Sequence, residues 1–489
     1  MILLAATPAR AADTIDLSPR FEPKQTMRVS INFEAGGNAL VRTTANGEPA
    51  SPGLSLPKSA GGGATPGAIG SASSGATGSA SALPAPATQQ QLPVSVTATL
   101  QYDERLLVPV RTAQQLQPGA PIAVRHYNQA EATIKVDKGG VAPRLADNRR
   151  VIVVEHQPTR PMLYSPAGPI PRDELDLVDI LGNTTVLDQL LPTKPVAQGD
   201  SWPTDQNTMA ALLTFDTVSV CEMESVLEEF NASFAKIRVA GVVHGTADGT
   251  PTEQEVRAVA LFDRRLGRIA RLNIAAREKR SIGAATPGLD AVARLQIKLE
   301  PAPAATELTD AAIAAAARTR RAANDVLLEV PGMGIRLVHD RQWFLTAQNR
   351  QAVTLRRLDR GDVVGQCTIT ALAPKSPGQQ GPLEQFQRDI VQSLGPNFGE
   401  MVSSRQWMSS RRHYCYGVIA RGTVQEVPIE WHHYLVAQET GHRVSVAVTI
   451  QGGQAARLGQ ADRALVEALE LFPPVQTPVQ AAAPAATVK

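Results

Sequence analysis

The fold of this chain is decided where a short helical pattern ends and a run of strands begins, in Leu190-Leu191-Pro192-Thr193-Lys194-Pro195-Val196-Ala197-Gln198-Gly199-Asp200-Ser201-Trp202. Pro192 and Pro195 fix φ and cannot continue a helix. Gly199-Asp200 is a turn signal that brings Trp202 to a defined place. We therefore predict a hinge at which a helical insert returns to a β-sheet. We expect the Trp202 indole to be largely buried there, with its N–H hydrogen-bonded.

Five alternating segments follow the hinge. Apolar and polar residues alternate along each of them, which is the pattern of a half-buried β-strand. Turn residues such as Ala247-Asp248-Gly249 separate the segments, and connections this short predict antiparallel neighbours in one sheet. The segments span residues 215–227, 232–244, 253–262, 269–278 and 291–299.

Further strands precede the hinge, and a low-complexity tract interrupts them. Residues 46–91 are rich in Gly, Ala, Ser and Pro, so they cannot bury enough apolar area to offset chain entropy. We expect a disordered insertion between two neighbouring strands. Its glycines are not a phosphate loop, because no Gly-Lys-Ser/Thr follows them. The strands are expected at 27–33, 94–100, 122–125, 132–136 and 150–155.

The pattern between these two groups of strands is helical. Residues 173–181 begin with acids, which suit a helix N-terminus, and residues 185–191 place their apolar side chains on one face. One long antiparallel sheet with a helical insert on a single face would curl into a half-barrel, with its concave face against the insert. Asp173, Asp176 and Asp179 could share a helix face and attract a cation, but a solvated acidic face is the favoured interpretation.

Residues 22–302 resemble the LolA/LolB-like half-barrel proteins of bacterial envelopes. The resemblance rests on the strand order, the helical insert and the Leu191-Pro192…Gly199-Asp200-Ser201-Trp202 turn. It implies an antiparallel half-barrel domain, which we assign to residues 12–302 together with the disordered insertion.

The pattern changes again after Pro301-Ala302-Pro303. We predict a helical connector over 303–324, a second domain over 325–472 and a disordered Ala/Pro/Val-rich tail over 473–489. Apolar register predicts helices that begin at Pro382 and at Leu458. Strands are expected at 334–338, 343–347, 352–358, 363–372, 401–408, 413–420, 428–437 and 443–450.

This second series of elements resembles the PsbP-like fold, an α/β/α sandwich shared by a photosystem extrinsic protein and a Ran-binding nuclear protein. The residues that carry the resemblance are Asp340-Arg341-Gln342-Trp343, Gly365-Gln366-Cys367-Thr368-Ile369, Pro428-Ile429-Glu430-Trp431 and Ala461-Asp462-Arg463. The fold implies a smaller α+β binding or assembly module and no catalytic residue.

Few residues suggest chemistry. Cys221, Cys367 and Cys415 are far apart in sequence; Cys367 with Cys415 is the more plausible disulfide, but three buried thiols are favoured. His413, Cys415 and His433 could share a strand face as zinc ligands, although structural histidines are the more common case.

Enzyme motifs are absent from the sequence. Ser201 lacks the second glycine of a nucleophile elbow, and no zinc-protease helix, Rossmann fingerprint or Cys-x-x-Cys is present. We therefore expect no catalytic site, no metal and no cofactor.

Composition and charge bear on the partners and the location of the protein. The 489 residues carry a net charge of +2 and only 4% aromatic residues, which argues against nucleic acid as a partner. The chain contains no run of about 18 apolar residues that would span a membrane. Ala9-Arg10-Ala11 fits the end of a truncated signal peptide over residues 1–11, so we expect a secreted or periplasmic protein.

The leading hypothesis is an exported, non-enzymatic protein that binds an apolar ligand or envelope partner in the concave face of its half-barrel. The alternative is a protein-assembly module acting through the PsbP-like domain, and an enzyme of unrecognised type comes third. A deep apolar cavity beneath the insert would favour the first hypothesis, and a filled core there with an exposed apolar patch on the second domain would favour the second. The residues expected to contact the ligand are Leu177, Leu187, Leu190, Leu191 and Trp202.

Overall fold

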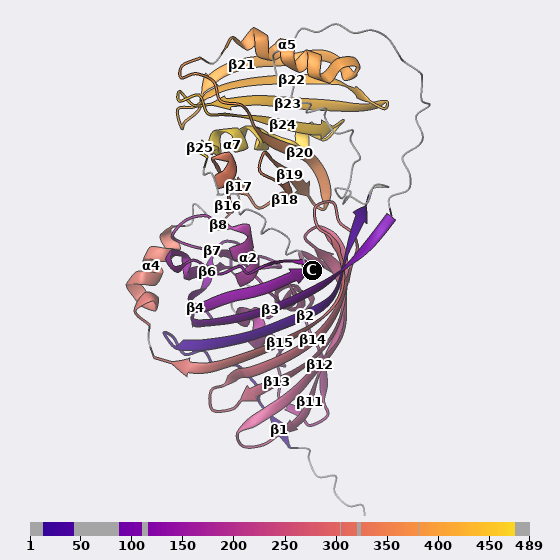
Figure 1. Cartoon of the computed structure of the whole chain (residues 1–489). Coiled ribbons are helices and arrows are strands. Elements are labelled where there is room, and N and C mark those ends of the chain that lie inside the picture. Colours follow the sequence, from indigo (N-terminus) through magenta and orange to yellow (C-terminus); the bar gives the residue numbers. More distant parts are fainter. Residues whose placement is uncertain are drawn as a thin grey trace, which may run out of the picture. The chain divides into compact units, whose positions relative to one another are not determined.

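The computed structural model describes residues 13–43, 88–109, 116–303, 305–319, 324–379 and 381–474. The chain forms two compact units, the first ending at Asp325 and the second beginning at Val326. Each unit is built on its own antiparallel sheet (Figure 1). The expected α+β class with antiparallel sheets is confirmed.

Several expected segments fall outside the described residues. These are the signal peptide, most of the insertion over 46–91 and most of the tail over 473–489. The last residues of the expected insertion, 88–91, instead begin a β-strand, because they continue the alternation of the strand that follows. No helix among the described residues is long and apolar enough to cross a membrane.

A twelve-stranded sheet dominates the first unit, and it curves around a group of short helices (Figure 1). Two further strands, β1 (Thr14–Ile15) and β9 (Val196–Ala197), pair with each other, and β8 (Ile170–Pro171) leads into the helices. The strands of the large sheet are β2 (Thr26–Thr43), β3 (Thr88–Leu106), β4 (Pro121–Val136), β5 (Gly139–Val141), β6 (Val151–Glu155), β7 (Met162–Tyr164), β10 (Ser201–Pro203), β11 (Thr217–Phe230), β12 (Phe234–Ala247), β13 (Thr250–Asp263), β14 (Arg268–Arg280) and β15 (Gly288–Ala302).

The order of the strands leaves the large sheet open. It runs β10-β11-β12-β13-β14-β15-β2-β3-β4-β6-β7, with β5 paired to β4. Within the described part of the chain, the edge strands β10 and β7 do not pair with each other. Each edge strand is only three residues long, which limits pairing with strands of other molecules.

Strict alternation explains why the long strands were predictable. Along β13 every second residue, from Thr250 to Phe262, is buried, while the residues between them are exposed or half-buried. The two strands expected at 122–125 and 132–136 are instead the single strand β4. A register shift opposite Gln101 and Tyr102 interrupts the alternation in the middle of this strand and hides its continuity in the sequence.

Three short helices form the insert on the concave side of the sheet. They are α2 (Arg172–Val178), the 3₁₀ helix η2 (Thr184–Leu190) and α3 (Gln206–Leu213). The apolar run after Gly182 was expected to form an α-helix but forms a 3₁₀ helix, which starts where the Asn183 side chain accepts a hydrogen bond from the Thr185 N–H.

The remaining helices of the first unit are one 3₁₀ helix between β5 and β6 and two helices near the C-terminal end of the unit. They are η1 (Asp147–Arg149), η3 (Thr306–Leu308) and α4 (Asp310–Arg318). Leu308 and Ile313 of this region pack with Val124, Val153 and Tyr164 of the sheet in one apolar cluster. The expected helical connector is therefore shorter than predicted, and it belongs to the core of the first unit.

The second unit contains a seven-stranded antiparallel sheet in the order β18-β19-β20-β24-β23-β22-β21 and a smaller sheet in which β17 lies between β16 and β25. The strands are β16 (Asp325–Val330), β17 (Ile335–Asp340), β18 (Trp343–Gln348), β19 (Ala352–Asp359), β20 (Asp362–Ala371), β21 (Phe398–Met408), β22 (Tyr414–Val424), β23 (Val427–Ala437), β24 (Arg443–Gln451) and β25 (Glu470–Leu471). The helices are η5 (Pro331–Met333), α5 (Leu383–Leu394), η6 (Gly395–Asn397), α6 (Ala455–Leu458) and α7 (Ala461–Ala468).

Helices α5 and α7 lie on opposite faces of this sheet. Phe386 of α5 stacks near Tyr416 of β22, with ring centroids 6.2 Å apart. Asp462 of α7 contacts Tyr434 of β23, which pairs with Gly417. Because Tyr416 and Gly417 are adjacent in one strand, they point to opposite faces, and so do the two helices.

Candidate functional site

The leucines expected to line a ligand cavity lie instead in the core of the first unit. Leu177, Leu187, Leu190 and Leu191 are each at most 4% exposed. The space beside the insert measures about 20 Å³, which is room for about one water molecule. Of the two outcomes that would distinguish the hypotheses, the structure has a filled core beneath the insert, because the apolar side chains of the insert pack against the sheet and fill the space.

Trp202 lies at the edge of the sheet, in β10. Its Nε1–H donates to the carbonyl oxygen of Leu190 at 2.9 Å, so the expected hydrogen bond is present and ties the edge strand to η2. The indole is half-buried rather than largely buried, because β10 has a neighbouring strand on one side only. The neighbouring Ser201 is exposed, and no base is hydrogen-bonded to its hydroxyl among the described residues.

A buried polar group joins the insert to the sheet. Arg125 Nε donates to Glu104 Oε1 at 2.9 Å, and the Thr184 hydroxyl donates to the same oxygen at 2.6 Å. The Arg125 guanidinium also lies 4.9 Å from the ring centroid of Tyr102, and burial raises the pKa of Tyr102, which stays neutral. Sequence reasoning missed this group. Its only sign in the sequence is a charged residue at an inward position of β3, Glu104, and another at an inward position of β4, Arg125.

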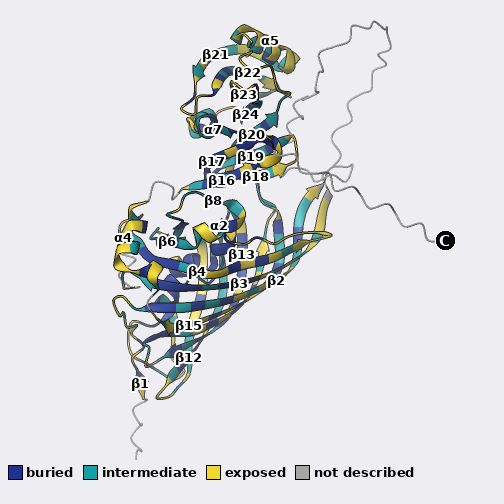
Figure 2. Ribbon diagram, turned by 60° about the vertical axis from the view of Figure 1, so that its left-hand side comes forward, coloured by how far each residue is buried: buried dark blue, intermediate teal, exposed yellow. Residues whose placement is uncertain are grey.

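The concave face of the sheet continues beyond the insert. Alternation along β2 places Phe33 and Ala35 on the same face as the buried Val29 and Ile31. Along β2 and β3 the residues change from buried to intermediate as the strands leave the insert (Figure 2). The outer parts of these strands therefore present apolar side chains that the insert does not cover.

Strand register brings six such residues together on four neighbouring strands. Ala293, Ala35, Val96 and Ile134 are direct partners in one row across β15, β2, β3 and β4. The rows on either side of it contribute Phe33 and Val94, and all six side chains are half-buried. We call these six residues the apolar strip: Phe33, Ala35, Val94, Val96, Ile134 and Ala293.

A glycine marks where the insert stops. Gly182 has φ of 94°, and a Cβ atom there would lie 2.4 Å from Cδ2 of Leu295 and 2.8 Å from Cδ1 of Ile297. The turn before η2 thus packs directly on β15 at Leu295, two residues after Ala293 of the apolar strip. Only glycine allows this approach, which places the insert against the end of the strip.

The same concave face is polar on β13 and β14. Gln254 donates to Glu278 at 3.0 Å, and Arg280 Nε donates to the other oxygen of Glu278 at 2.9 Å. These residues occupy inward positions next to the apolar strip, since Glu278 pairs with Ala291 of β15. The concave face therefore has an apolar part and a charged part side by side.

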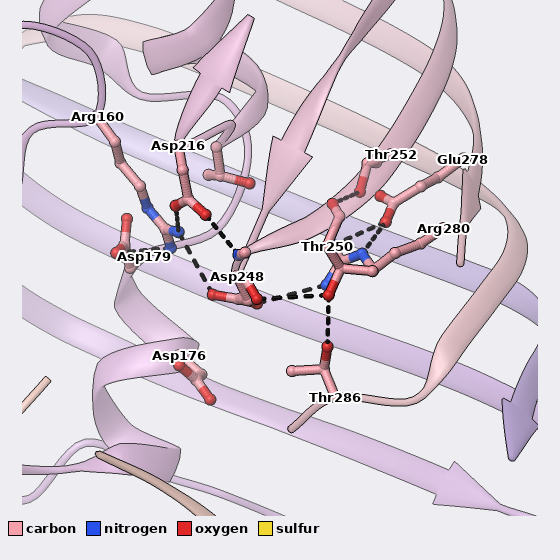
Figure 3. Close-up of polar contacts among 12 residues, drawn as sticks. Arg160, Asp176, Asp179, Asp216, Asp248, Thr250, Thr252, Glu278, Arg280 and Thr286 are labelled. Atoms are coloured by element: carbon pink, nitrogen blue, oxygen red, sulfur yellow. Dashed lines mark hydrogen bonds and ion pairs between the residues drawn. The ribbon is translucent and has the colours of Figure 1, made fainter. Parts of the chain in front are cut away.

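Ion pairs connect the charged part to the loop before α2 (Figure 3). Arg160 lies 2.9 Å from Asp179, 3.8 Å from Asp216 and 3.9 Å from Asp248, and Arg280 lies 3.4 Å from Asp248. Burial raises the pKa of Asp216, and the nearby Asp248 charge adds to this, although the Gly249 N–H acts in the opposite direction. Each carboxylate has a basic or N–H partner, so the group holds the insert against the sheet.

The acids of α2 do not share a site. Asp173 is exposed, Asp176 pairs with Arg172 at 2.8 Å, and Asp179 pairs with Arg160. Asp179 lies past the end of α2, which breaks the helical spacing on which a shared face depends. No group of His, Cys, Asp and Glu among the described residues is arranged to hold a metal ion.

Strand register also separates the histidines that could have shared a zinc ion. His432 pairs with Ile419, on the face of Cys415, and His433 therefore points to the opposite face. The set His413, Cys415 and His433 is divided between two faces. Burial lowers the pKa of His433 to about 4, so it is neutral.

The cysteines are free thiols. Cys367 and Cys415 are fully buried, as the favoured interpretation held, and burial raises the pKa of Cys415 to about 12. Cys221 is only half-buried, because it lies on β11 next to the short edge strand. A disulfide between Cys367 and Cys415 is not formed.

Two motifs that carried the PsbP-like resemblance meet in the second unit. His432 Nδ1 lies 2.5 Å from Asp462 Oδ2, and its Nε2 lies 2.8 Å from Glu430 Oε1. The Tyr434 hydroxyl donates to the same oxygen of Asp462. Asp462 and Glu430, which are far apart in sequence, thus share one buried imidazole, and this group joins α7 to the sheet.

Comparisons with known proteins do not place the chain in a family. No known protein family and no curated protein matches the sequence. The solution structure of cyanobacterial PsbP (CyanoP) from Synechocystis covers 30% of this chain and 93% of its own, with 9% identity and a TM-score of 0.25. A Mog1 mutant covers 30% and 96%, with 9% identity and a TM-score of 0.23.

A protein from Bacteroides thetaiotaomicron covers 30% of this chain and 48% of its own, with 11% identity and a TM-score of 0.23. The PsbP structure bears the name of the fold predicted for residues 325–472. Similarity at this level carries no argument, so the architecture of the second unit rests on its own strand order, and the resemblance to LolA/LolB-like proteins stays a prediction.

Proposed function

We propose that this chain is an exported, non-enzymatic protein that binds an apolar ligand on the concave face of its first unit. The apolar strip carries this proposal. Six half-buried apolar residues from four neighbouring strands form one continuous surface on the concave face. A contiguous apolar surface of this kind is typical of a binding site.

The shape of the strip favours a slender ligand. Ala293, Ala35, Val96 and Ile134 form a single row across four strands, with one further apolar residue on either side of it, so the strip is narrow. An alkyl chain lying there would lose contact with water along its length, at about 25 cal/mol per Å² of buried apolar area. The charged part of the face, at Glu278 and Arg280, borders the strip and would stay hydrated.

Matched substitutions on one strand test the proposal. Val96 faces the apolar strip, whereas the neighbouring Thr97 is exposed on the other face of β3. Val96→Asp places a carboxylate against the ligand and should weaken binding of the uncharged probe N-phenyl-1-naphthylamine at least about tenfold, or about 1.4 kcal/mol. Thr97→Asp adds the same charge and should leave the affinity within about twofold.

Fluorescence titration of the full chain measures both affinities, with a monoacylglycerol as an uncharged competitor. Equal affinities of the two variants, or a parent protein that does not bind the probe, would contradict the proposed site. Circular dichroism of both variants should match the parent, because Val96 is half-exposed and tolerates a polar side chain.

Two observations favour the alternative function of protein assembly: the filled core beneath the insert and an exposed apolar patch on the second unit. Met408 is 51% exposed and Val402 is 41% exposed on the edge strand β21, and Tyr414, the direct partner of Met408, is 38% exposed. An envelope protein could pair with this edge. Met408→Arg should then abolish cross-linking to a partner in the host envelope, while Val96→Asp should not affect it.

A further inference from the structure

A separate hollow lies in the first unit where the N-terminal segment passes a buried ion pair. Its volume is about 120 Å³. A cavity of about 150 Å³ holds benzene, so the hollow has room for roughly five non-hydrogen atoms. Its lining is apolar at Pro19, Phe21, Leu106 and Pro109 and polar at Ser18, Arg20, Glu22, Gln25, Asp188 and Arg268.

The buried ion pair leaves one donor unused. Arg268 Nε donates to Asp188 Oδ2 at 2.7 Å, and the Ile269 N–H donates to Asp188 Oδ1 at 3.0 Å. Asp188 is 1% exposed and Arg268 is 4% exposed. Both oxygens of the acid are therefore satisfied, yet Arg268 Nη2 is buried without a hydrogen-bond partner among the described residues.

An unpaired guanidinium nitrogen is costly in a folded protein. A buried donor that lacks an acceptor has lost its hydrogen bonds to water without replacement, and the loss is larger when the group is charged. Arg268 lines the hollow, so a ligand that carries an acceptor can supply the missing partner. The ligand must be an acceptor, because arginine only donates.

A second arginine lies next to Arg268. Arg20 donates its backbone N–H to the Gly267 carbonyl oxygen at 2.8 Å, and its side chain crosses Gly267 so closely that a Cβ atom there would lie 2.6 Å from Arg20 Cγ. Gly267 has φ of 69°, which glycine adopts readily. The turn thus places two positive side chains at the hollow. Of the two carboxylates there, Asp188 already has its partners, and Glu22 accepts a hydrogen bond from Gln25 Nε2 at 3.0 Å.

We propose that this hollow binds a small monocarboxylate, with one carboxylate oxygen accepting from Arg268 Nη2. The apolar side chains of Phe21 and Leu106 and the rings of Pro19 and Pro109 would surround its short hydrocarbon tail. A phosphate has no hydrocarbon part to fill the space beside these four side chains. Butyrate, with six non-hydrogen atoms, is close to the available volume. This site is independent of the apolar strip, which takes an uncharged chain.

Butyrate, butyramide and inorganic phosphate at matched ionic strength provide the test, by isothermal titration calorimetry on the full chain. Butyramide has the shape of butyrate without its charge. We expect butyrate to bind at least about tenfold more tightly than butyramide or phosphate, because only butyrate combines the negative charge with an apolar tail. Equal binding of butyramide, preferential binding of phosphate or no binding of butyrate would overturn the proposal.

Three variants locate the site. Arg268→Lys keeps a cation beside Asp188 but lacks Nη2, and Leu106→Phe fills the hollow while leaving Arg268 in place; each should weaken butyrate binding at least about tenfold. Arg265→Gln, an exposed arginine of the same turn, should leave it unchanged. If Arg268→Lys does not fold, Leu106→Phe decides, and undiminished binding in that variant would overturn the assignment.

Discussion

The buried imidazole of His432 makes the stability of the second unit depend on pH. Burial alone would lower the pKa of His432, but its hydrogen bonds to Asp462 and Glu430 outweigh this and raise the pKa. A group whose pKa is raised on folding stabilises the protein fully below its unfolded pKa of about 6.5, and loses this contribution as the pH rises through the folded pKa. We therefore expect the free energy of unfolding of the second unit to fall as the pH is raised above about 6.5.

Urea denaturation at a series of pH values measures this effect. His432→Gln should cost about 3 kcal/mol at about pH 6, because it leaves Asp462 buried without its cationic partner, and it should remove the decline above about pH 6.5. His442→Gln is the control, since burial lowers the pKa of His442 and this residue cannot cause the decline. A decline that persists in His432→Gln would show that another group titrates.

Trp202 makes a smaller contribution than a core tryptophan. Truncation of a fully buried aromatic residue costs about 3–5 kcal/mol, but this indole is half-buried, so we expect about 2 kcal/mol for Trp202→Ala. Trp202→Phe keeps most of the ring and loses the hydrogen bond to Leu190, which should cost about 1 kcal/mol. Denaturation curves of the two variants check both values, and curves that overlay the parent would show that β10 does not hold the insert.

At the scale of elements, the contact between the insert and β15 depends on Gly182. Gly182→Ala combines a strained positive φ with a clash against Leu295 and Ile297, and we expect a loss of about 3 kcal/mol. Gly199→Ala is a matched control, because Gly199 also has a positive φ, of 89°, but a Cβ atom there would meet nothing within 4 Å.

In the control, Gly199→Ala, the free energy of unfolding should fall only by the cost of backbone strain, about 1 kcal/mol. Chemical denaturation compares the two variants directly. Equal losses would show that the insert shifts away from β15 at little cost, and that the boundary of the apolar strip is not fixed by this contact.

The elements that the sequence predicts well are those whose pattern is local. The alternation of β13 and the apolar register of α5, which begins and ends at Leu383 and Leu394, can be recognised from neighbouring residues alone. The interruption within β4 could not be predicted, because a register shift leaves no mark in composition. The strand β16 was missed, because the apolar Leu327 at an outward position hides its alternation.

The candidate site was only partly predictable for a similar reason. The sequence indicated an apolar concave face, but it placed the ligand at the leucines of the insert, such as Leu187 and Leu190. An apolar helical face looks the same whether it packs against a sheet or lines a cavity, and only the tertiary structure distinguishes the two. Val96 and Ile134 were read as ordinary strand residues, because their exposure depends on where the insert ends.

At the scale of the whole molecule, the two units combine ordinary antiparallel architecture with an uncovered apolar surface on the first unit. The large sheet of the first unit ends in two short edge strands and buries its insert in a filled core. The concave face keeps the apolar strip on β15, β2, β3 and β4 for an apolar ligand. The central claim is that an apolar chain rests there.

Photo-crosslinking with a long-chain alcohol that carries a diazirine tests this claim most directly. After irradiation of the full chain with the alcohol, mass spectrometry of the peptides identifies the labelled residues. The apolar strip predicts labels on β2, β3, β4 and β15 at inward positions such as Ala35, Val96 and Ile134, and loss of the labels in Val96→Asp but not in Thr97→Asp. Labels confined to outward positions such as Thr97, or to the second unit, would contradict it.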